Sequence, residues 1–152
     1  IWDLAALLAD IRRAWHEKEM PAATEFRLEI PAGLPPVRAD ADQVRIVFDE
    51  LIRNALEAIR GLQAPDLVIN CLPDVADEKL VIRVQDNGCG MIPEVLERAF
   101  TPFYSHRPAG RGRGLGLSRA ARLAEINGGR LRLFSRPGEG TQAILELPAA
   151  SD

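Results

Sequence analysis

The sequence has little cysteine, no long apolar run and no large excess of one charge. Its two cysteines, Cys71 and Cys89, lie on separate segments without metal-ligand spacing, which predicts free thiols in a reducing, cytoplasmic compartment. No stretch approaches the roughly 18 apolar residues of a membrane span, and no secretory signal is present, so we expect no direct membrane contact. A net charge of −3 gives no reason to expect a nucleic-acid binder.

What remains is the composition of an ordinary globular domain. The 152 residues are 47% hydrophobic and 27% charged, without repeats or low-complexity segments. That length can bury most of its apolar surface around one core, so we expect residues 1–152 to form a single domain. Because the chain begins with Ile1 instead of Met, we also expect it to be a piece of a longer protein.

Hydrophobic periodicity divides the chain into helices and strands. The predicted helices cover residues 4–15, 40–60, 93–100 and 115–126, and the predicted strands cover residues 26–30, 67–72, 79–85, 131–134 and 141–147. Asp40 and Gln43 resemble a capping box that opens the second helix. The order predicts an α+β domain in two layers, with one mixed sheet and the helices packed on one of its faces.

The second predicted helix carries two polar residues beside its apolar stripe. Glu50 and Asn54 are four residues apart, so their side chains leave one face of the helix, one turn from each other. An amide oxygen suits Mg²⁺, whose other ligands would be waters and nucleotide phosphates. A carboxylate there could orient or deprotonate a nucleophile. Taken alone, the pair is more simply explained as polar residues at the margin of a helix.

A strand is predicted to end in a glycine turn at residues 86–90. An ionised Asp86 can only accept hydrogen bonds, so it would pair with an exocyclic amine such as that of adenine. Gly88 and Gly90 would permit positive φ and a close approach of the backbone to a flat base. A turn capped by Asp86 and Asn87 explains the same residues equally well.

A second glycine run, at residues 112–117, joins a loop to a predicted helix. Closely spaced backbone N–H groups at a helix N-terminus bind phosphates. The spacing is neither that of a Walker P-loop nor that of a dinucleotide fingerprint. Arg107, Arg111 and Arg113 add positive charge, as a solvated basic loop or as a lid over a triphosphate. A last run, at residues 138–141, is by itself most simply a hairpin turn.

Together these segments resemble the boxes of the Bergerat-fold ATPases, and in particular the catalytic domain of a sensor histidine kinase. The N box is similar to residues 49–58, the F box to residues 100–105, and the glycine boxes to residues 86–90, 112–117 and 138–141. The resemblance implies a mostly antiparallel mixed sheet, ATP and Mg²⁺ as cofactors, and Asn54 as the metal ligand. It implies catalytic roles for Glu50 and Asn54, and ATP contacts from Asn54, Asp86, Gly88, Gly90, Phe100, Arg107, Gly112, Arg113, Gly114, Leu115, Gly116, Leu117 and Thr141.

The resemblance also implies a reaction and partners. The γ-phosphoryl group of ATP would move to a histidine on a separate helical dimerisation domain of the parent protein, and then to an aspartate of a response regulator. The isolated domain would be a monomer, and the parent could still be anchored in a membrane. The dimerisation and phosphoacceptor domain is absent from this chain, so the domain should bind ATP without phosphorylating itself.

Two departures from the family pattern leave an alternative open. Many family kinases carry asparagine where this chain has Glu50, and lysine near the position of His106 and Arg107. Glutamate resembles the ATP-hydrolysing branch and the anti-sigma-factor serine kinases, so a hydrolase or a conformational module is the second hypothesis. His16 begins a superficial phosphoacceptor pattern, but the helical hairpin that should follow has no room before the N box. We therefore predict no acceptor role for His16.

Overall fold

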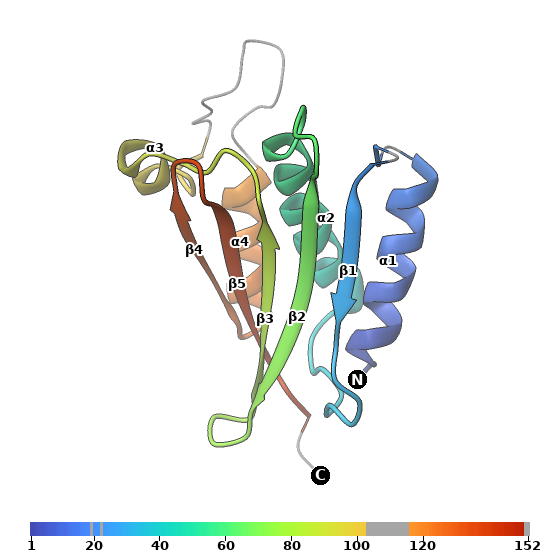
Figure 1. Cartoon of the computed structure of the whole chain (residues 1–152). Coiled ribbons are helices and arrows are strands. Elements are labelled where there is room, and N and C mark those ends of the chain that lie inside the picture. The colour runs from blue at the N-terminus through green and yellow to red at the C-terminus, as the bar shows by residue number, and fades with distance from the viewer. Residues whose placement is uncertain (19, 22, 103–115, 151–152) are drawn as a thin grey trace.

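The computed structural model describes residues 1–18, 20–21, 23–102 and 116–150. Its elements, in chain order, are α1 (Leu4–Lys18), β1 (Glu25–Glu29), α2 (Ala41–Ala58), β2 (Asp66–Asp74), β3 (Lys79–Asp86), α3 (Pro93–Glu97), α4 (Gly116–Ile126), β4 (Arg130–Arg136) and β5 (Gly140–Pro148) (Figure 1). The order of helices and strands is the predicted one. Among the described residues, no helix is both long enough and apolar enough to cross a membrane.

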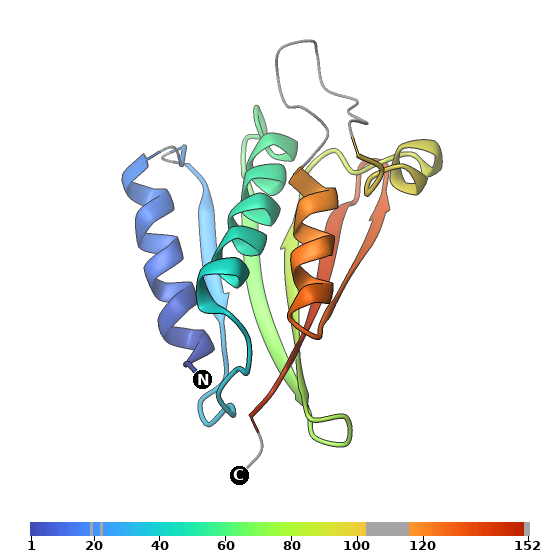
Figure 2. The ribbon, with the colours of Figure 1, turned by 180° about the vertical axis from the view of Figure 1, so that it is seen from behind.

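The five strands form one mixed sheet in the order β1-β2-β3-β5-β4. β1 runs parallel to β2, and the other neighbouring pairs are antiparallel. The parallel pair is joined through α2, because parallel neighbours need a crossover connection. Helices α1, α2 and α4 lie on one face of this sheet (Figure 2). The predicted two-layer α+β fold with a mostly antiparallel sheet is therefore confirmed.

The core lies between the helices and this face of the sheet. Alternate residues of β3 are buried, as a strand with one covered face requires. Helix α2 contributes a continuous apolar stripe to the same core. The largest fully buried side chains are Phe48, Leu4, Leu8, Ile11, Ile52, Ile59, Leu67, Ile69, Leu80, Ile82, Leu145 and Leu147. Each stabilises the fold by about 1.5–3 kcal/mol of transfer free energy relative to an exposed side chain.

The start of α2 is capped with the help of a residue that follows α4. The Asp40 carboxylate accepts the Gln43 N–H at 3.0 Å, as predicted. The Gln43 side chain does not return the bond; its Oε1 accepts from the Asn127 amide at 2.8 Å. Asn127 Oδ1 in turn accepts the Asp40 N–H, also at 2.8 Å. This bridge joins the first turn of α2 to the end of α4, so the second half of α2 lies beside the beginning of α4.

Most element boundaries differ from the predicted ones by a few residues. Helix α2 ends at Ala58 instead of residue 60, with Ile59 as its C-cap and Gly61 at a φ of 85° in the turn that follows. Helix α3 ends at Glu97 instead of residue 100. Strands β2 and β5 are longer than predicted because ladder hydrogen bonds extend past their apolar residues.

Candidate nucleotide-binding site

Helix α2 connects the two ends of the candidate site. Glu50, Asn54 and Ala58 follow one another at one-turn intervals along it. The separation of eight positions between Glu50 and Ala58 corresponds to about 12 Å along the helix axis. Glu50 faces α4, whereas Ala58 contacts the first glycine turn. The half-buried Asn54 lies between them. Residues from the N box, the first glycine box and the second are thus arranged along one helix.

The Glu50 carboxylate is buried and bound by two arginines. Its side chain is 9% exposed; its Oε1 forms an ion pair with Arg53 at 2.9 Å and accepts a hydrogen bond from Arg119 of α4. Its Oε2 lies against the Cα of Gly116, where a Cβ would overlap it. Gly116 therefore makes room for the carboxylate, a role that the sequence did not indicate. The i,i+3 spacing could have predicted the Arg53 contact. Arg119 is 69 residues away from Glu50, so no local signal pointed to it.

Asp86 is the buried carboxylate at the other end of the site. It ends β3, is 7% exposed, and its Oδ1 accepts the Gly88 N–H at 2.8 Å. Burial raises the pKa of Asp86 to about 6, although the backbone N–H groups of Gly88 and Thr141 oppose this rise. The capped turn and the binding interpretation are compatible, since a carboxylate can accept about four hydrogen bonds and this one accepts two of them from the backbone.

The first glycine turn lies directly on the last turn of α2. A Cβ on Gly88 would come within 2.6 Å of both the Cβ and the carbonyl oxygen of Ala58. The neighbouring Cys89 donates its N–H to that carbonyl at 3.2 Å. Only glycine at position 88 allows this approach. The contact brings the Asp86 carboxylate beside the helix that carries Asn54.

The segment at 138–141 packs against the first glycine turn, which a plain hairpin turn would not need to do. Gly138 donates its N–H to the Cys89 carbonyl at 2.7 Å. Gly140 has a φ of 81°, and the carbonyl of Asp86 occupies the space that its Cβ would need. This close packing of backbones directs the Thr141 N–H to the Asp86 carboxylate.

Ser135 on β4 is a site residue that the sequence analysis missed. Its Oγ accepts the Met91 N–H at 2.8 Å and lies 3.0 Å from the Gly140 carbonyl and 2.8 Å from Thr141 Oγ1. One hydroxyl thus joins the segment after the first glycine turn to the last glycine run. A serine at this point of the chain gives no sequence signal for this role, because the positions of Met91 and Gly140 relative to it depend on how the segments pack.

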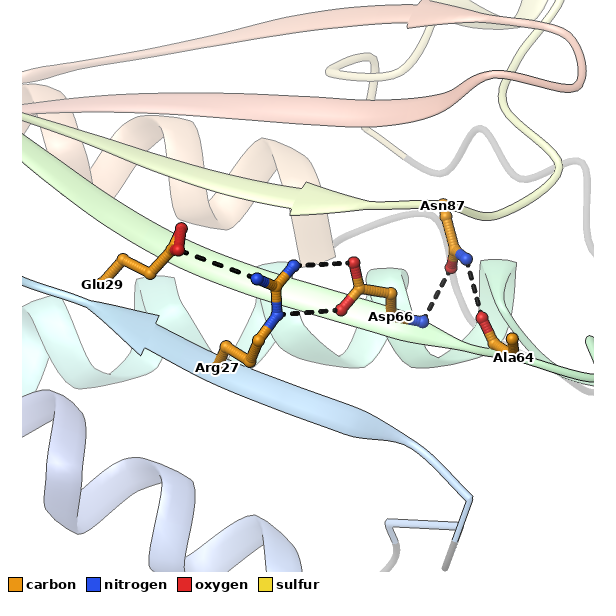
Figure 3. A network of polar contacts seen from close by, with 5 residues as sticks. All are labelled: Arg27, Glu29, Ala64, Asp66 and Asn87. Atoms are coloured by element: carbon orange, nitrogen blue, oxygen red, sulfur yellow. Dashed lines mark hydrogen bonds and ion pairs between the residues drawn. The ribbon is translucent and has the colours of Figure 1, made fainter.

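Asn87 joins the same turn to the start of the neighbouring strand β2 (Figure 3). Its Oδ1 accepts the Asp66 N–H, and its Nδ2 donates to the Ala64 carbonyl, both at 2.8 Å. The Asp66 carboxylate forms an ion pair with Arg27 of β1 at 3.0 Å, and Glu29 lies 3.7 Å from the same guanidinium. Asn87 is therefore a structural residue, and the turn is held on both sides of Asp86.

The remaining predicted residues divide between described and undescribed parts of the chain. Phe100 and Leu117 are half-buried and pack against the core. Arg107, Gly112, Arg113, Gly114 and Leu115 lie outside the described residues. Within the described ranges, no cluster of three or more His, Cys, Asp or Glu side chains could hold a metal ion. An amide such as Asn54 as the protein's ligand fits Mg²⁺, which commonly keeps waters and binds substrate phosphates.

Comparison with known proteins shows the family to which a chain with this candidate site belongs. Residues 39–151 match the family model described as histidine kinase-, DNA gyrase B-, and HSP90-like ATPase. The chain belongs to this ATPase family. The methanogenesis regulatory histidine kinase FilI of Methanothrix harundinacea is 32% identical over 138 residues, which make up 88% of this chain and 15% of FilI. This chain spans a quarter or less of the length of curated relatives such as FilI.

Solved structures agree with the family over nearly the whole chain. The catalytic domain of the histidine kinase ThkA has a TM-score of 0.83 and 25% identity, covering 97% of this chain and 93% of ThkA's domain. Full-length ShkA in complex with AMPPNP has a TM-score of 0.79 at 24% identity, covering 99% of this chain and 31% of ShkA. This member of the family is the ATP-binding catalytic domain of a sensor histidine kinase.

Proposed function

We propose that residues 1–152 form one catalytic domain that binds ATP with Mg²⁺ and phosphorylates a histidine on a separate helical dimerisation domain. The observation that carries the proposal is the pair of buried carboxylates beside α2. Asp86 lies at the end of α2 near the glycine turn, and Glu50 lies about two turns away against the start of α4. An elongated nucleotide needs an acceptor for its base at one end and an anion-binding group at the other; Asp86 of β3 and the start of α4, beside Glu50, are proposed to provide them.

Asp86 is proposed to select adenine. Its carboxylate still has acceptor capacity beyond the Gly88 and Thr141 N–H groups, so it can accept from the exocyclic amine of adenine. The carbonyl of guanine at that position would meet an acceptor and be repelled. Gly88 and Gly90 pack closely against Ala58 and the Arg136 carbonyl, and the turn that they fix is proposed to present its backbone to the base.

The start of α4 is proposed to bind the phosphates. Helix α4 has 11 residues, and its N-terminal N–H groups and dipole favour anions. Arg107, Gly112, Arg113, Gly114 and Leu115 are proposed to complete the phosphate contacts. Asn54 is proposed to ligate Mg²⁺, which would neutralise charge on the phosphates.

In the proposed reaction, a nitrogen of the acceptor imidazole forms a bond to the γ-phosphorus while the bond to the β–γ bridging oxygen breaks. The products are phosphohistidine and ADP, and the imidazole proton leaves to a base or to water. The phosphoryl group would then pass to an aspartate of a response regulator. We further propose that the domain acts in the cytoplasm and is monomeric when isolated, with no nucleic-acid partner.

The second candidate is an ATP-hydrolysing or anti-sigma-factor-type module, which Glu50 favours. Its carboxylate is buried next to Gly116, on the side where the phosphates are proposed to bind. A carboxylate in that place could activate water or a serine hydroxyl instead of leaving the nucleotide to a histidine.

One experiment separates the two candidates. The domain is mixed with radiolabelled ATP, Mg²⁺ and a matching dimerisation domain, and acid-labile, alkali-stable phosphohistidine is measured. Asp86→Asn should remove the signal, whereas Asp77→Asn, which changes an exposed carboxylate at the β2–β3 turn, should leave it unchanged. Steady phosphate release without label on the acceptor would contradict the kinase proposal.

A further inference from the structure

We propose that Arg119, assisted by Arg53, restrains Glu50 so that its carboxylate does not act as a base toward water, and ATP is kept for the protein acceptor. The inference rests on the proposed function and concerns how that site suppresses hydrolysis. Glutamate at this position is what left the hydrolase alternative open. Restraint by the two arginines would allow a kinase to have glutamate at position 50 without hydrolysing ATP.

The surroundings of Glu50 restrict both of its oxygens. Oε1 accepts a charge-assisted hydrogen bond from Arg119 and forms an ion pair with Arg53 at 2.9 Å. Oε2 lies against the Cα of Gly116. A general base must have an oxygen within hydrogen-bond reach of the proton that it accepts, or be linked to it through one water. In this arrangement, Oε1 is bound by two guanidinium groups and Oε2 faces the backbone at Gly116.

Arg53 is itself held in place from α1. Its guanidinium lies 5.8 Å from the centroid of the Trp15 ring, a cation–π distance. The Trp15 indole donates to Asp49 Oδ1 at 2.9 Å, which orients the ring. Trp15, Arg53 and Glu50 therefore form a chain of contacts from α1 through α2 to Arg119 of α4. The restraint on Glu50 is built from three helices and is not a local helix pair.

Arg119 is suited to be removed without damaging the core. Its side chain is 58% exposed, so the residue extends from solvent to a carboxylate that is only 9% exposed. Arg122 lies three residues further along α4 and is also exposed. The ion pairs that Glu50 makes with described residues are those with Arg53 and Arg119, so Arg122 provides a matched control of equal charge.

The test measures phosphate release from ATP and Mg²⁺ in the absence of an acceptor. We expect Arg119→Met to raise the rate about tenfold or more, since a positioned general base contributes about 10²–10⁴-fold to a reaction. Arg122→Met should leave the rate unchanged. The double variant Glu50→Gln/Arg119→Met should lose the increase, which would show that it comes from the released carboxylate. Adding Arg53→Met to Arg119→Met should increase the rate further.

A binding measurement separates this role from direct contact with the nucleotide. The dissociation constant of a non-hydrolysable ATP analogue should differ by less than about threefold between the wild type and Arg119→Met. Loss of a direct contact with the nucleotide would be expected to change it by about tenfold or more. Loss of analogue binding in Arg119→Met would make Arg119 a nucleotide ligand and overturn the inference. So would an unchanged hydrolysis rate, or an increase that persists in the double variant.

Transfer to the acceptor histidine is measured on the same samples. If the wild type labels no acceptor but Arg119→Met still hydrolyses faster, the kinase proposal fails and the restraint on Glu50 stands. If the wild type labels the acceptor and Arg119→Met shows no faster hydrolysis, the restraint fails and the kinase proposal stands.

Discussion

Replacing Asp86 by asparagine should stabilise the nucleotide-free domain at neutral pH while removing nucleotide binding. Burial raises the pKa of Asp86 to about 6 from its ordinary value of 3.8. That difference corresponds to about 3 kcal/mol by which the ionised carboxylate destabilises the folded state at pH values above 6. Asparagine carries no charge and can still accept the Gly88 N–H. Asparagine no longer accepts the Thr141 N–H, which lowers the free energy of unfolding by about 1 kcal/mol. The net increase in the free energy of unfolding should therefore be about 2 kcal/mol.

The pH dependence isolates Asp86 from every other titrating group. Because its folded pKa lies above the unfolded value, the folded state binds more protons between about pH 4 and 6, and the wild type loses stability as the pH rises through this window. The asparagine variant lacks this loss. Its unfolding free energy relative to the wild type should therefore grow by about 2 kcal/mol between about pH 4.5 and about pH 7.5.

Urea unfolding of both proteins at several pH values, without nucleotide, measures this difference. At neutral pH, the melting temperature of the variant should be higher by about 4–8 °C. Asp77→Asn, which changes an exposed carboxylate, should show no such pH-dependent gain. A variant that is less stable than the wild type at every pH would refute the reasoning, because the ionised carboxylate would then be a net stabilising group.

Three further predictions concern the turns, the bridge between helices and the thiols. Gly88→Ala should weaken nucleotide binding while the fold is retained, because its Cβ would lie 2.6 Å from Ala58; circular dichroism with a binding titration tests this, and unchanged affinity would contradict it. Asn127→Ala removes the hydrogen bonds that join α2 to α4 and should lower the unfolding free energy by about 1–3 kcal/mol in urea titrations. A change below about 0.5 kcal/mol would assign the capping of α2 to Asp40 alone. In native labelling with a thiol reagent, the exposed Cys89 should react rapidly. Cys71 should not react, because burial raises its pKa to about 11; equal reactivity of both thiols would disprove this assignment.

The sequence predicted the elements and the local geometry of the site well. The 3.6-residue repeat placed Glu50 and Asn54 on one face of a helix, and the structure has that helix. The alternation of apolar and polar residues predicted a strand that is followed by a glycine turn at Asp86, and β3 ends at this residue. The cap at Asp40 was predicted correctly as far as its own carboxylate. These features depend on residues only a few positions apart, so they can be predicted from short stretches of the sequence.

The contacts between segments could not be predicted in the same way. Gly140 was explained as a hairpin glycine, but the Asp86 carbonyl is what excludes a side chain there. The sequence analysis assigned no role to Arg119 or to Ser135, which lies just beyond the strand predicted at residues 131–134. Each has partners that only the order of strands and the packing of helices bring close.

The sequence by itself therefore determined that two polar residues share a helix face and that a glycine turn follows the strand ending at Asp86, because backbone geometry sets those local spacings. Tertiary structure alone decided that Glu50 is bound by two arginines, that Asn127 joins α2 to α4, and that the pKa of Asp86 rises. Burial and ion pairing depend on what surrounds a group in space, and those neighbours come from distant parts of the chain.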